Sequence, residues 1–287
     1  MTVWKAANGV RRSRSAKFKN RRGQIERDYR HYYTFVKNKP VSALVEEPIL
    51  EAATEELSDL EFIFDASDLV ENPSTRLPIC LCLDVSGSMA GEAIEELNKG
   101  VEVFYEALKE DEVALYAADV SIITFDSKAT LVQEFSSIAG SEAPPAFEAG
   151  GKTYMGEAVN IALDALESRK AEYQENGVDY YQPWLVLMTD GTPNGQLEEL
   201  SKASDRTAKM IENRKLTVFP IGIGSRADLK SLEKFSPSRS PLRLQGFKFK
   251  EFFSWLSQSV AATSQSIPGE SIPMDIKGLK GWADLSL

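Results

Sequence analysis

The stretch Leu77-Pro-Ile-Cys-Leu-Cys-Leu-Asp-Val-Ser-Gly-Ser-Met89 decides the fold of this chain. Its first part, Ile79–Leu83, is a continuous apolar run, as expected for a strand that is covered on both faces of a sheet. The run ends on Asp84, and two hydroxyls, Ser86 and Ser88, follow it at alternate positions. These side chains offer only oxygen atoms, which suits a hard cation such as Mg²⁺ or Mn²⁺ and argues against zinc or copper. The stretch therefore predicts a buried strand with a candidate metal site at its carboxyl end.

The composition is typical of a globular chain. Of 287 residues, 43% are hydrophobic and 26% are charged. No apolar run approaches the length of a membrane span, and the basic N-terminus lacks the apolar core of a secretory signal, so we expect a cytoplasmic protein with no membrane contact. The two cysteines, Cys80 and Cys82, share one strand and are poorly placed to form a disulfide. His31 is the only histidine, so no serine or cysteine nucleophile has an evident histidine base.

Charge is segregated along the first 75 residues, within a net charge of −10 for the chain. Residues 1–40 hold twelve Lys and Arg against two acids, whereas residues 41–75 hold ten acids and no Lys or Arg. We expect a basic arm over 1–40, extended or as a short helix, and an acidic linker over 41–76 that is helical around 48–70. The arm offers candidate contacts to anions or nucleic acid through Arg11, Arg12, Arg14, Lys17, Lys19, Arg21 and Arg22. A solvated tail, or an arm that docks on an acidic protein surface, is the alternative.

From Leu77 onward the pattern alternates between strands and helices. We expect strands at 79–83, 120–125, 129–135, 184–189, 216–223 and 242–244, and helices at 91–109, 155–169, 196–213, 229–235 and 249–264. Repeated β-α units predict an α/β fold with a doubly wound, mostly parallel sheet, in which 129–135 is one antiparallel edge strand. We expect this domain to span 77–269, followed by an irregular tail over 270–287. Two spare acids, Asp119 and Asp126, are expected in turns.

Two further polar loops fall where a helix begins or a strand ends. The loop Gly150-Gly-Lys-Thr153 leads into a helix, and Asp190 follows an apolar strand. Because such sheets bind ligands beyond the carboxyl ends of their strands, we expect these loops to meet the first one. The expected metal residues are Asp84, Ser86, Ser88, Thr153 and Asp190. Each of them alone has an ordinary structural explanation as a helix cap or a turn residue, so the prediction rests on the set.

The donor set indicates what such a site would do. Two carboxylates balance the charge of a divalent ion formally, and three neutral hydroxyls leave the ion electrophilic. The start of a helix close to the first loop adds positive potential. A carboxylate from a partner is therefore the natural further ligand.

The three-part pattern resembles the metal-ion-dependent adhesion site of von Willebrand factor type A domains. The resemblance rests on Asp84-x-Ser86-x-Ser88, Gly151-Lys-Thr153 and Thr189-Asp190-Gly191, whose five oxygen-bearing residues match the metal positions of that family one for one. It implies a Rossmann-like α/β fold and a non-enzymatic, Mg²⁺-dependent module, or one that uses Mn²⁺, which binds another protein through an acidic side chain. By the same resemblance, the surface for the partner would include Met89, Gly151, Lys152 and Thr192.

Longer stretches resemble the bacterial tellurium-resistance-associated subgroup of these domains. They are Pro78–Met89, Gly150–Thr153, Pro183–Pro193, Ile221–Gly224 and Phe249–Gly269. Relatives in this subgroup are often encoded beside protein kinases and PP2C-like phosphatases in stress or phage-conflict operons. The resemblance implies a scaffold or adaptor in a bacterial stress-response or phage-defence system, with a kinase or such a phosphatase as a possible partner.

Two other functions stay open from the sequence. A Mg²⁺-dependent phosphoryl-transfer or hydrolytic enzyme could use the same site, but the chain has no P-loop signature and no second carboxylate cluster. A nucleic-acid-associated adaptor would bind through the basic arm. The acidic segment Glu46–Glu71 also carries carboxylates of the kind that a metal site attracts, in the same or a neighbouring copy. A solvated linker that neutralises the basic arm is the alternative.

Overall fold

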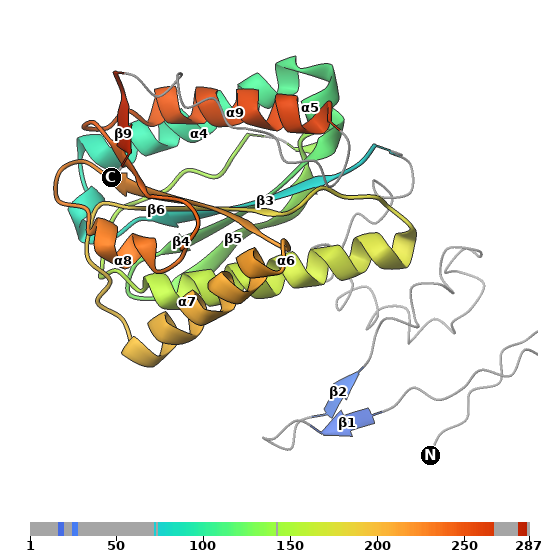
Figure 1. Ribbon diagram of the computed structural model, residues 1–287, viewed down its shortest axis with the longest axis horizontal. Helices are drawn as coiled ribbons and strands as arrows, with labels where there is room; N and C mark the ends of the chain where they lie inside the picture. Colours follow the sequence, from blue (N-terminus) through green and yellow to red (C-terminus); the bar gives the residue numbers. More distant parts are fainter. Residues whose placement is uncertain are drawn as a thin grey trace, which may run out of the picture. The chain divides into compact units, whose positions relative to one another are not determined.

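Figure 1 shows the computed structural model of the chain. The structure describes residues 72, 74–141, 143–266 and 281–285, and two short strands near the N-terminus, β1 (Lys17–Lys19) and β2 (Ile25–Arg27). β1 and β2 pair antiparallel within a unit of residues 1–64, and a second unit spans residues 65–287. This pairing is not predicted from the sequence. The acidic segment up to residue 71, with the helix expected around 48–70, lies outside the described residues.

The second unit is built on a mixed sheet whose described strands lie in the order β5-β4-β3-β6-β7-β8-β9. Their bounds are β3 (Leu77–Asp84), β4 (Ala118–Phe125), β5 (Ala129–Ser137), β6 (Trp184–Thr189), β7 (Thr217–Ile223), β8 (Leu242–Leu244) and β9 (Ala283–Leu285). The strands from β4 to β8 in this order run parallel, and β5 and β9 pair antiparallel at the two edges. β3, β4 and β6 are buried along their whole length, which explains the apolar runs of β3 and β6, whereas β4 also buries polar residues. The predicted α/β fold with a mostly parallel sheet is confirmed.

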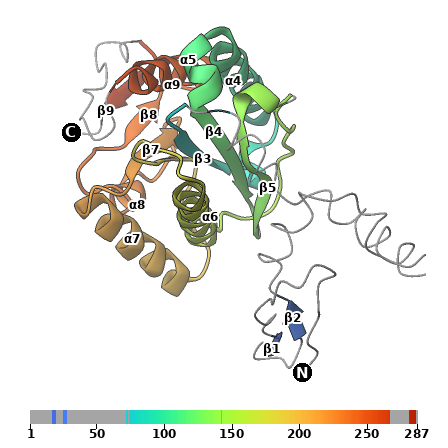
Figure 2. The same ribbon diagram turned by 90° about the vertical axis from the view of Figure 1, so that its right-hand side faces the viewer.

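Helices cover both faces of this sheet (Figures 1 and 2). One face carries α4 (Glu92–Glu110), α5 (Glu112–Ala117) and α9 (Phe249–Ser264), and the other carries α6 (Met155–Asn176), α7 (Leu197–Glu212) and α8 (Leu229–Glu233). Val101 and Phe104 of α4 pack with Phe253 of α9 in the first core, and Leu163 and Leu166 of α6 belong to the second. The sheet is therefore buried between two apolar cores. None of the helices in the described part of the chain is long and apolar enough to cross a membrane.

The strand order creates a switch point beside β3. The chain leaves β3 through α4 and α5 to reach β4 on one side, and it later returns through α6 to β6 on the other side. Ligand sites in such sheets lie in the crevice outside the carboxyl ends of the strands at this point. β3 ends at Asp84, and β6 ends at Thr189, directly before Asp190. The topology therefore places both carboxylates of the predicted site at the carboxyl ends of two neighbouring central strands.

Two short elements depart from the sequence prediction. The tail after Pro268 is predicted to be irregular, and this is wrong at its end, because Ala283–Leu285 forms β9 beside β8. There Trp282 packs against Trp255 in a tilted arrangement, with 6.0 Å between the ring centroids, so aromatic packing accompanies the added strand. The helix α5 is also missing from the prediction; it is one and a half turns long and is capped by Asp111.

The prediction that Asp119 lies in a turn is wrong, whereas Asp126 does lie in the turn after β4. Asp119 is inside β4 and fully buried. Its Oδ2 accepts hydrogen bonds from the guanidinium of Arg169, at 2.7 Å from Nε, and from the hydroxyl of Tyr173. Both donors lie on α6, which is predicted to end at Arg169 but continues to Asn176. The buried carboxylate explains the longer helix, because a charge inside a core must be paired and hydrogen-bonded.

We expect Arg169→Met to lower the free energy of unfolding by about 3–5 kcal/mol, because it leaves the carboxylate of Asp119 buried without its cation. Urea denaturation measures this loss. Lys99→Met is the control, since it removes a solvent-exposed pair with Glu96 and should change stability little. Replacing Asp119 by Leu in the Arg169→Met background should restore much of the stability. If the Arg169→Met single variant is as stable as the wild type, Arg169 does not compensate the buried carboxylate of Asp119.

Candidate metal site at the switch point

Asp84 is the buried centre of the site. Its Oδ1 accepts a hydrogen bond from the backbone amide of Ser86 at 2.8 Å, and its Oδ2 accepts one from the hydroxyl of Thr189 at 2.5 Å. The hydroxyl of Thr189 also accepts a hydrogen bond from the amide of Gly191 at 3.2 Å. The bond to Ser86 is the local Asx turn that redirects the chain after β3. The bond to Thr189 ties the first polar loop to the third, so both carboxylate oxygens are fixed.

A chain of hydroxyls links the same two loops on the solvent side. The Oγ atoms of Ser86 and Ser88 are 3.1 Å apart, and the hydroxyl of Ser88 donates to Oδ1 of Asp190 at 2.6 Å. Ser86 and Asp190 are buried, with 2% and 5% of their surface exposed, whereas Ser88 is exposed. The oxygen cluster therefore extends from the buried carboxyl ends of β3 and β6 to the surface.

The second loop completes the cluster through backbone contacts. The amide of Gly150 donates to the carbonyl of Val85 at 2.8 Å, and the amide of Gly87 donates to the carbonyl of Gly151 at 3.1 Å. Gly151 has φ +73°, and a Cβ there would lie 2.7 Å from Oγ of Ser127, so the turn requires glycine. These bonds hold the second loop against the first.

Thr153 is the predicted metal residue of this second loop. Its amide donates to Oδ1 of Asn194 at 2.8 Å, and the amide of Asn194 donates to its carbonyl at 3.1 Å. Its hydroxyl lies 3.9 Å from the point where a Cβ on Gly191 would stand, and only 5% of the residue is exposed. The structure thus brings all five predicted metal residues to one place at the ends of β3 and β6.

The electrostatics of the cluster favour a cation. Burial raises the pKa of Asp84 to about 6, against the lowering effect of its hydrogen bonds from Ser86 and Thr189, and the nearby charge of Asp190 raises this pKa further. A positive charge placed between the two carboxylates would stabilise their ionised forms. The guanidinium of Arg226 is a positive charge beside one of the two carboxylates, with Nη2 3.6 Å from Oδ2 of Asp190.

The chemistry of the donors fits a small divalent cation. The cluster offers two carboxylates and three hydroxyls, all of them oxygen ligands, and it reaches solvent at Ser88, where water or a ligand can complete the coordination. In the described ranges, no group of three or more His, Cys, Asp or Glu side chains is arranged to hold a metal. The set therefore fits Mg²⁺ or Mn²⁺ and lacks the nitrogen and sulfur ligands that zinc and copper prefer.

Comparison with known families assigns the fold. Residues 79–255, more than half of the chain, match the von Willebrand factor type A domain. The chain belongs to the von Willebrand factor type A domain family. Domains of this family typically serve as protein-interaction modules, and many bind a divalent metal at a metal-ion-dependent adhesion site. The matched range contains all three polar loops of the cluster.

Relatives of this von Willebrand factor type A domain are distant. The uncharacterized protein sll0103 of Synechocystis sp. is 28% identical over 172 residues, which are 57% of this chain and 36% of that protein. The chain thus spans about a third of the length of this curated relative. The pilus adhesin SpaC of Lactobacillus rhamnosus GG, in its open conformation, superposes with a TM-score of 0.52 at 13% identity, over 66% of this chain and 30% of that one. A von Willebrand factor type A protein of Catenulispora acidiphila gives a TM-score of 0.48 at 18% identity, over 65% and 43% of the two chains.

Arg226 is the residue of the site that sequence reasoning misses. It lies in the turn after β7, the strand next to β6, and 77% of its side chain is exposed. The glycine turn Ile221-Gly-Ile-Gly224 marks the carboxyl end of β7 in the sequence. A basic side chain directly after that turn was the available signal, because the carboxyl ends of neighbouring parallel strands meet at one edge.

The predicted partner surface is corrected at Met89. This side chain is fully buried in the first core, because the 3₁₀ turn Gly87–Met89 directs it inward, so it cannot contact a partner in this conformation. Gly151, Lys152 and Thr192 are exposed around the cluster. The anion contacts expected of the basic arm stay predictions: Lys17 and Lys19 are residues of β1, and the arginines named with them lie outside the described residues.

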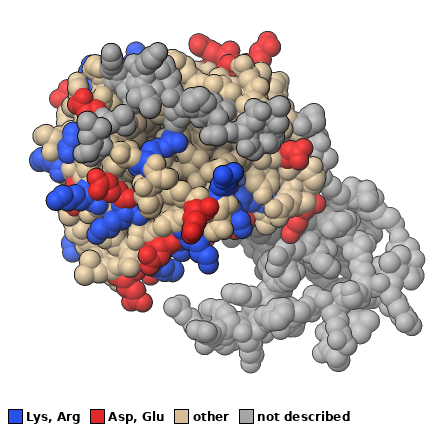
Figure 3. All heavy atoms as spheres, in the orientation of Figure 1, with Lys and Arg blue, Asp and Glu red and all other residues tan. Residues whose placement is uncertain are grey.

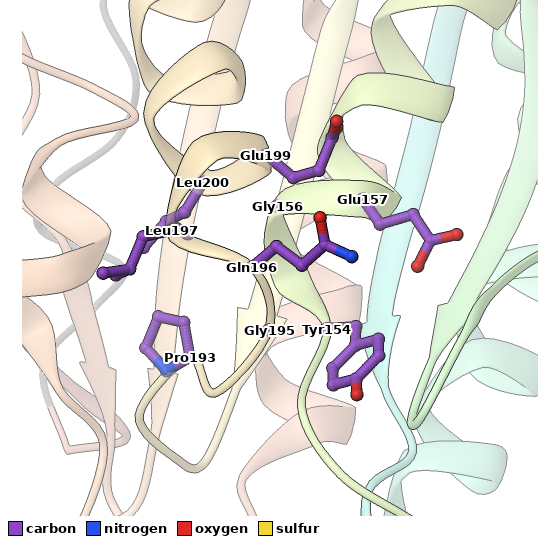
Figure 4. Close-up of a pocket in the computed structure, with 9 residues that line it drawn as sticks. All are labelled: Tyr154, Gly156, Glu157, Pro193, Gly195, Gln196, Leu197, Glu199 and Leu200. Carbon is purple, nitrogen blue, oxygen red and sulfur yellow. The ribbon is translucent and has the colours of Figure 1, made fainter.

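A pocket of about 370 Å³ opens beside the second and third loops (Figure 4). Its lining includes Tyr154, directly after Thr153, and Pro193, three residues after Asp190. Leu197 of α7 lies at its rim with 82% of the residue exposed. The lining of the pocket is partly apolar and does not include the five predicted metal residues. Figure 3 shows a face on which basic and acidic side chains alternate, so no single sign of charge dominates that view.

We expect Thr189→Val to lower the free energy of unfolding by about 1–3 kcal/mol, because it leaves a buried carboxylate oxygen of Asp84 without its donor. Denaturation in the presence of a chelator measures this effect without any contribution from bound cations. Thr189→Ser keeps the hydroxyl and is the matched control, so it should retain more stability than the valine variant. Equal losses for Ser and Val would show that packing of the methyl group, not the hydrogen bond, matters here.

Proposed function

We propose that this domain binds a partner protein through a divalent cation, Mg²⁺ or Mn²⁺, held by the oxygen cluster at the switch point. The residues that would hold the ion are Asp84, Ser86, Ser88, Thr153 and Asp190. The observation that carries the proposal is the hydrogen-bonded chain Ser86–Ser88–Asp190, which gathers oxygen ligands from two loops and reaches the surface at Ser88. When bound, the ion would act as a Lewis acid that accepts a carboxylate oxygen from the partner.

Each residue has a distinct part in this binding role. Asp84, fixed through both oxygens, supplies negative charge from the interior, directly or through a water molecule. Asp190 supplies the second charge, while Ser86, Ser88 and Thr153 supply neutral oxygens. The two carboxylates balance the formal charge of the ion, and the three neutral hydroxyls leave it electrophilic, so the site can bind one further carboxylate oxygen. Lys152 and Thr192, exposed at the rim, would contact the partner around that anion.

The proposal is a binding role and not an enzymatic one. The cluster contains no histidine or cysteine that could serve as a base or nucleophile. The resemblance to the tellurium-resistance-associated subgroup supports a finer proposal: a cytoplasmic scaffold or adaptor in bacterial stress response or phage defence, with a kinase or PP2C-like phosphatase as partner. This context is an analogy with relatives.

We expect Mg²⁺ to bind the full chain and to raise its stability, by about 2.7 kcal/mol when the free ion is at one hundred times its dissociation constant. Asp84→Ala should weaken Mg²⁺ binding at least about tenfold, because it removes a carboxylate of the site. Titration calorimetry and thermal unfolding at graded Mg²⁺ concentrations measure both effects. Asp164→Asn, which changes an exposed acid on α6, is the control and should bind as the wild type does. A wild-type chain that binds neither Mg²⁺ nor Mn²⁺ would overturn the proposal.

We further expect partner capture by the immobilised full chain to require both the ion and Asp84. Proteins recovered by the wild type with Mg²⁺ should be lost with a chelator and with Asp84→Ala, and retained with Asp164→Asn. The same preparations should not hydrolyse p-nitrophenyl phosphate. Hydrolysis by the wild type that disappears in Asp84→Ala would instead make the domain an enzyme. Capture that survives the chelator but is abolished by removing residues 1–40 would assign binding to the basic arm.

A further inference from the structure

Arg226 places a guanidinium beside the third loop of the site. Its Nη2 lies 3.6 Å from Oδ2 of Asp190, while Oδ1 of the same carboxylate accepts the hydroxyl of Ser88 at 2.6 Å. The side chain of Asp190 is 6% exposed and that of Arg226 is 77% exposed. One carboxylate is therefore shared between a metal-site hydroxyl on one side and an arginine that extends into solvent on the other.

The main chain that carries Arg226 is anchored on both sides. Before it, the amide of Gly224 donates to the carbonyl of Leu244 at 3.1 Å, and the guanidinium of Arg243 donates to the carbonyl of Gly224 at 2.7 Å. After it, the amide of Asp228 points to the carbonyl of Gly191 at 3.5 Å, within the third loop itself. The fold thus delivers this guanidinium to the site, while the exposed side chain keeps the freedom to rotate.

The ion pair between Arg226 and Asp190 is weak enough for another cation to replace the arginine. An ion pair with an exposed arginine is weak, because solvent screens it and ordering the long side chain costs entropy. A divalent ion carries twice the charge and would be held by several oxygens at once, so it would displace the guanidinium from Asp190. A displaced guanidinium would remain within a Debye length of the ion, and its planar fork matches the two oxygens of a carboxylate.

We propose that Arg226 is a second cation of this site, which competes with the metal ion for Asp190 and then binds the carboxylate of the acidic ligand. The inference rests on the proposed metal-dependent function and adds a selectivity to it. A ligand carboxylate would bind both the ion and, through two charge-assisted hydrogen bonds, the guanidinium, whereas a neutral oxygen ligand would form only weaker hydrogen bonds with the guanidinium. Arg226 would therefore favour acidic side chains over amides and hydroxyls.

The first arm of the test titrates the full chain with Mg²⁺, and in parallel with Mn²⁺, by calorimetry. Arg226→Gln should bind the ion about three- to tenfold more tightly than the wild type, because a competing positive charge is removed. Lys230→Gln is the matched control, since it removes the same charge from an exposed position on α8, four residues further along the chain. Its ion affinity should stay within about twofold of the wild type, as expected for a screened surface charge.

The second arm uses acetate as the simplest carboxylate and follows its binding to Mg²⁺-loaded protein by NMR titration. Arg226→Gln should weaken acetate binding about three- to tenfold although it binds the ion more tightly, and Lys230→Gln should not. Arg226→Lys keeps the charge but loses the fork, so its ion affinity should stay near that of the wild type while acetate binds more weakly.

The outcomes separate this inference from the function on which it rests. If the wild type binds the ion but Arg226→Gln matches Lys230→Gln in both titrations, Arg226 has no part in the site and only this inference fails. If the wild type binds neither Mg²⁺ nor Mn²⁺, the proposed function fails and the inference fails with it. Tighter ion binding together with unchanged acetate binding in Arg226→Gln would also overturn the proposal. It would show that the arginine competes with the metal ion for Asp190 but does not bind the carboxylate.

Discussion

The pair of hydrogen bonds that Asp84 accepts is the constraint on which the site depends. A carboxylate that is fully buried needs donors in fixed positions, and here they come from the loop after β3 and from the last residue of β6. Thr189 can reach Asp84 only because the register pairs Leu83 with Met188, which brings the next residues of the two strands side by side. The connection between these two parallel neighbours is long: it passes through α4, α5, β4 and β5, and its last helix, α6, leads into β6 on the other side of β3. The site therefore follows from the strand order.

The sequence predicts the sheet and the oxygen cluster well, because both produce patterns that can be recognised within a few consecutive residues. β3 and β6 are buried on both faces and read as apolar runs, and polar residues directly after them mark the carboxyl ends of neighbouring strands. Once the fold class is known, these ends must meet. The periodicity of the helix Phe249–Ser264 likewise predicts its bounds, since its apolar face packs on α4.

What the sequence does not predict depends on packing between distant segments. β9 is a short strand that exists because β8 offers an edge, and Asp119 sits in an apolar strand because Arg169, fifty residues later, neutralises it. Met89 adjoins the metal loop in sequence and is predicted to contact a partner. One 3₁₀ turn instead directs its side chain into the core. The glycine turn before Arg226 places this residue at the carboxyl end of a strand, but only the fold shows that this end lies beside Asp190. In each case the decisive contact is long-range.

The charges of the site explain how binding can depend on a metal ion. Above pH of about 6, where Asp84 is ionised, its carboxylate, that of Asp190 and the guanidinium of Arg226 sum to a charge of −1. This negative charge attracts a cation and repels an acidic ligand. Adding a divalent ion changes the sum to +1, so the same surface then attracts a carboxylate. With the two carboxylates alone, the loaded site would be neutral, and only the local field of the ion would favour an anion. Among these three groups, the arginine completes the change of sign when the ion binds, which gives a physical reason for an acidic partner to bind more tightly when the ion is present.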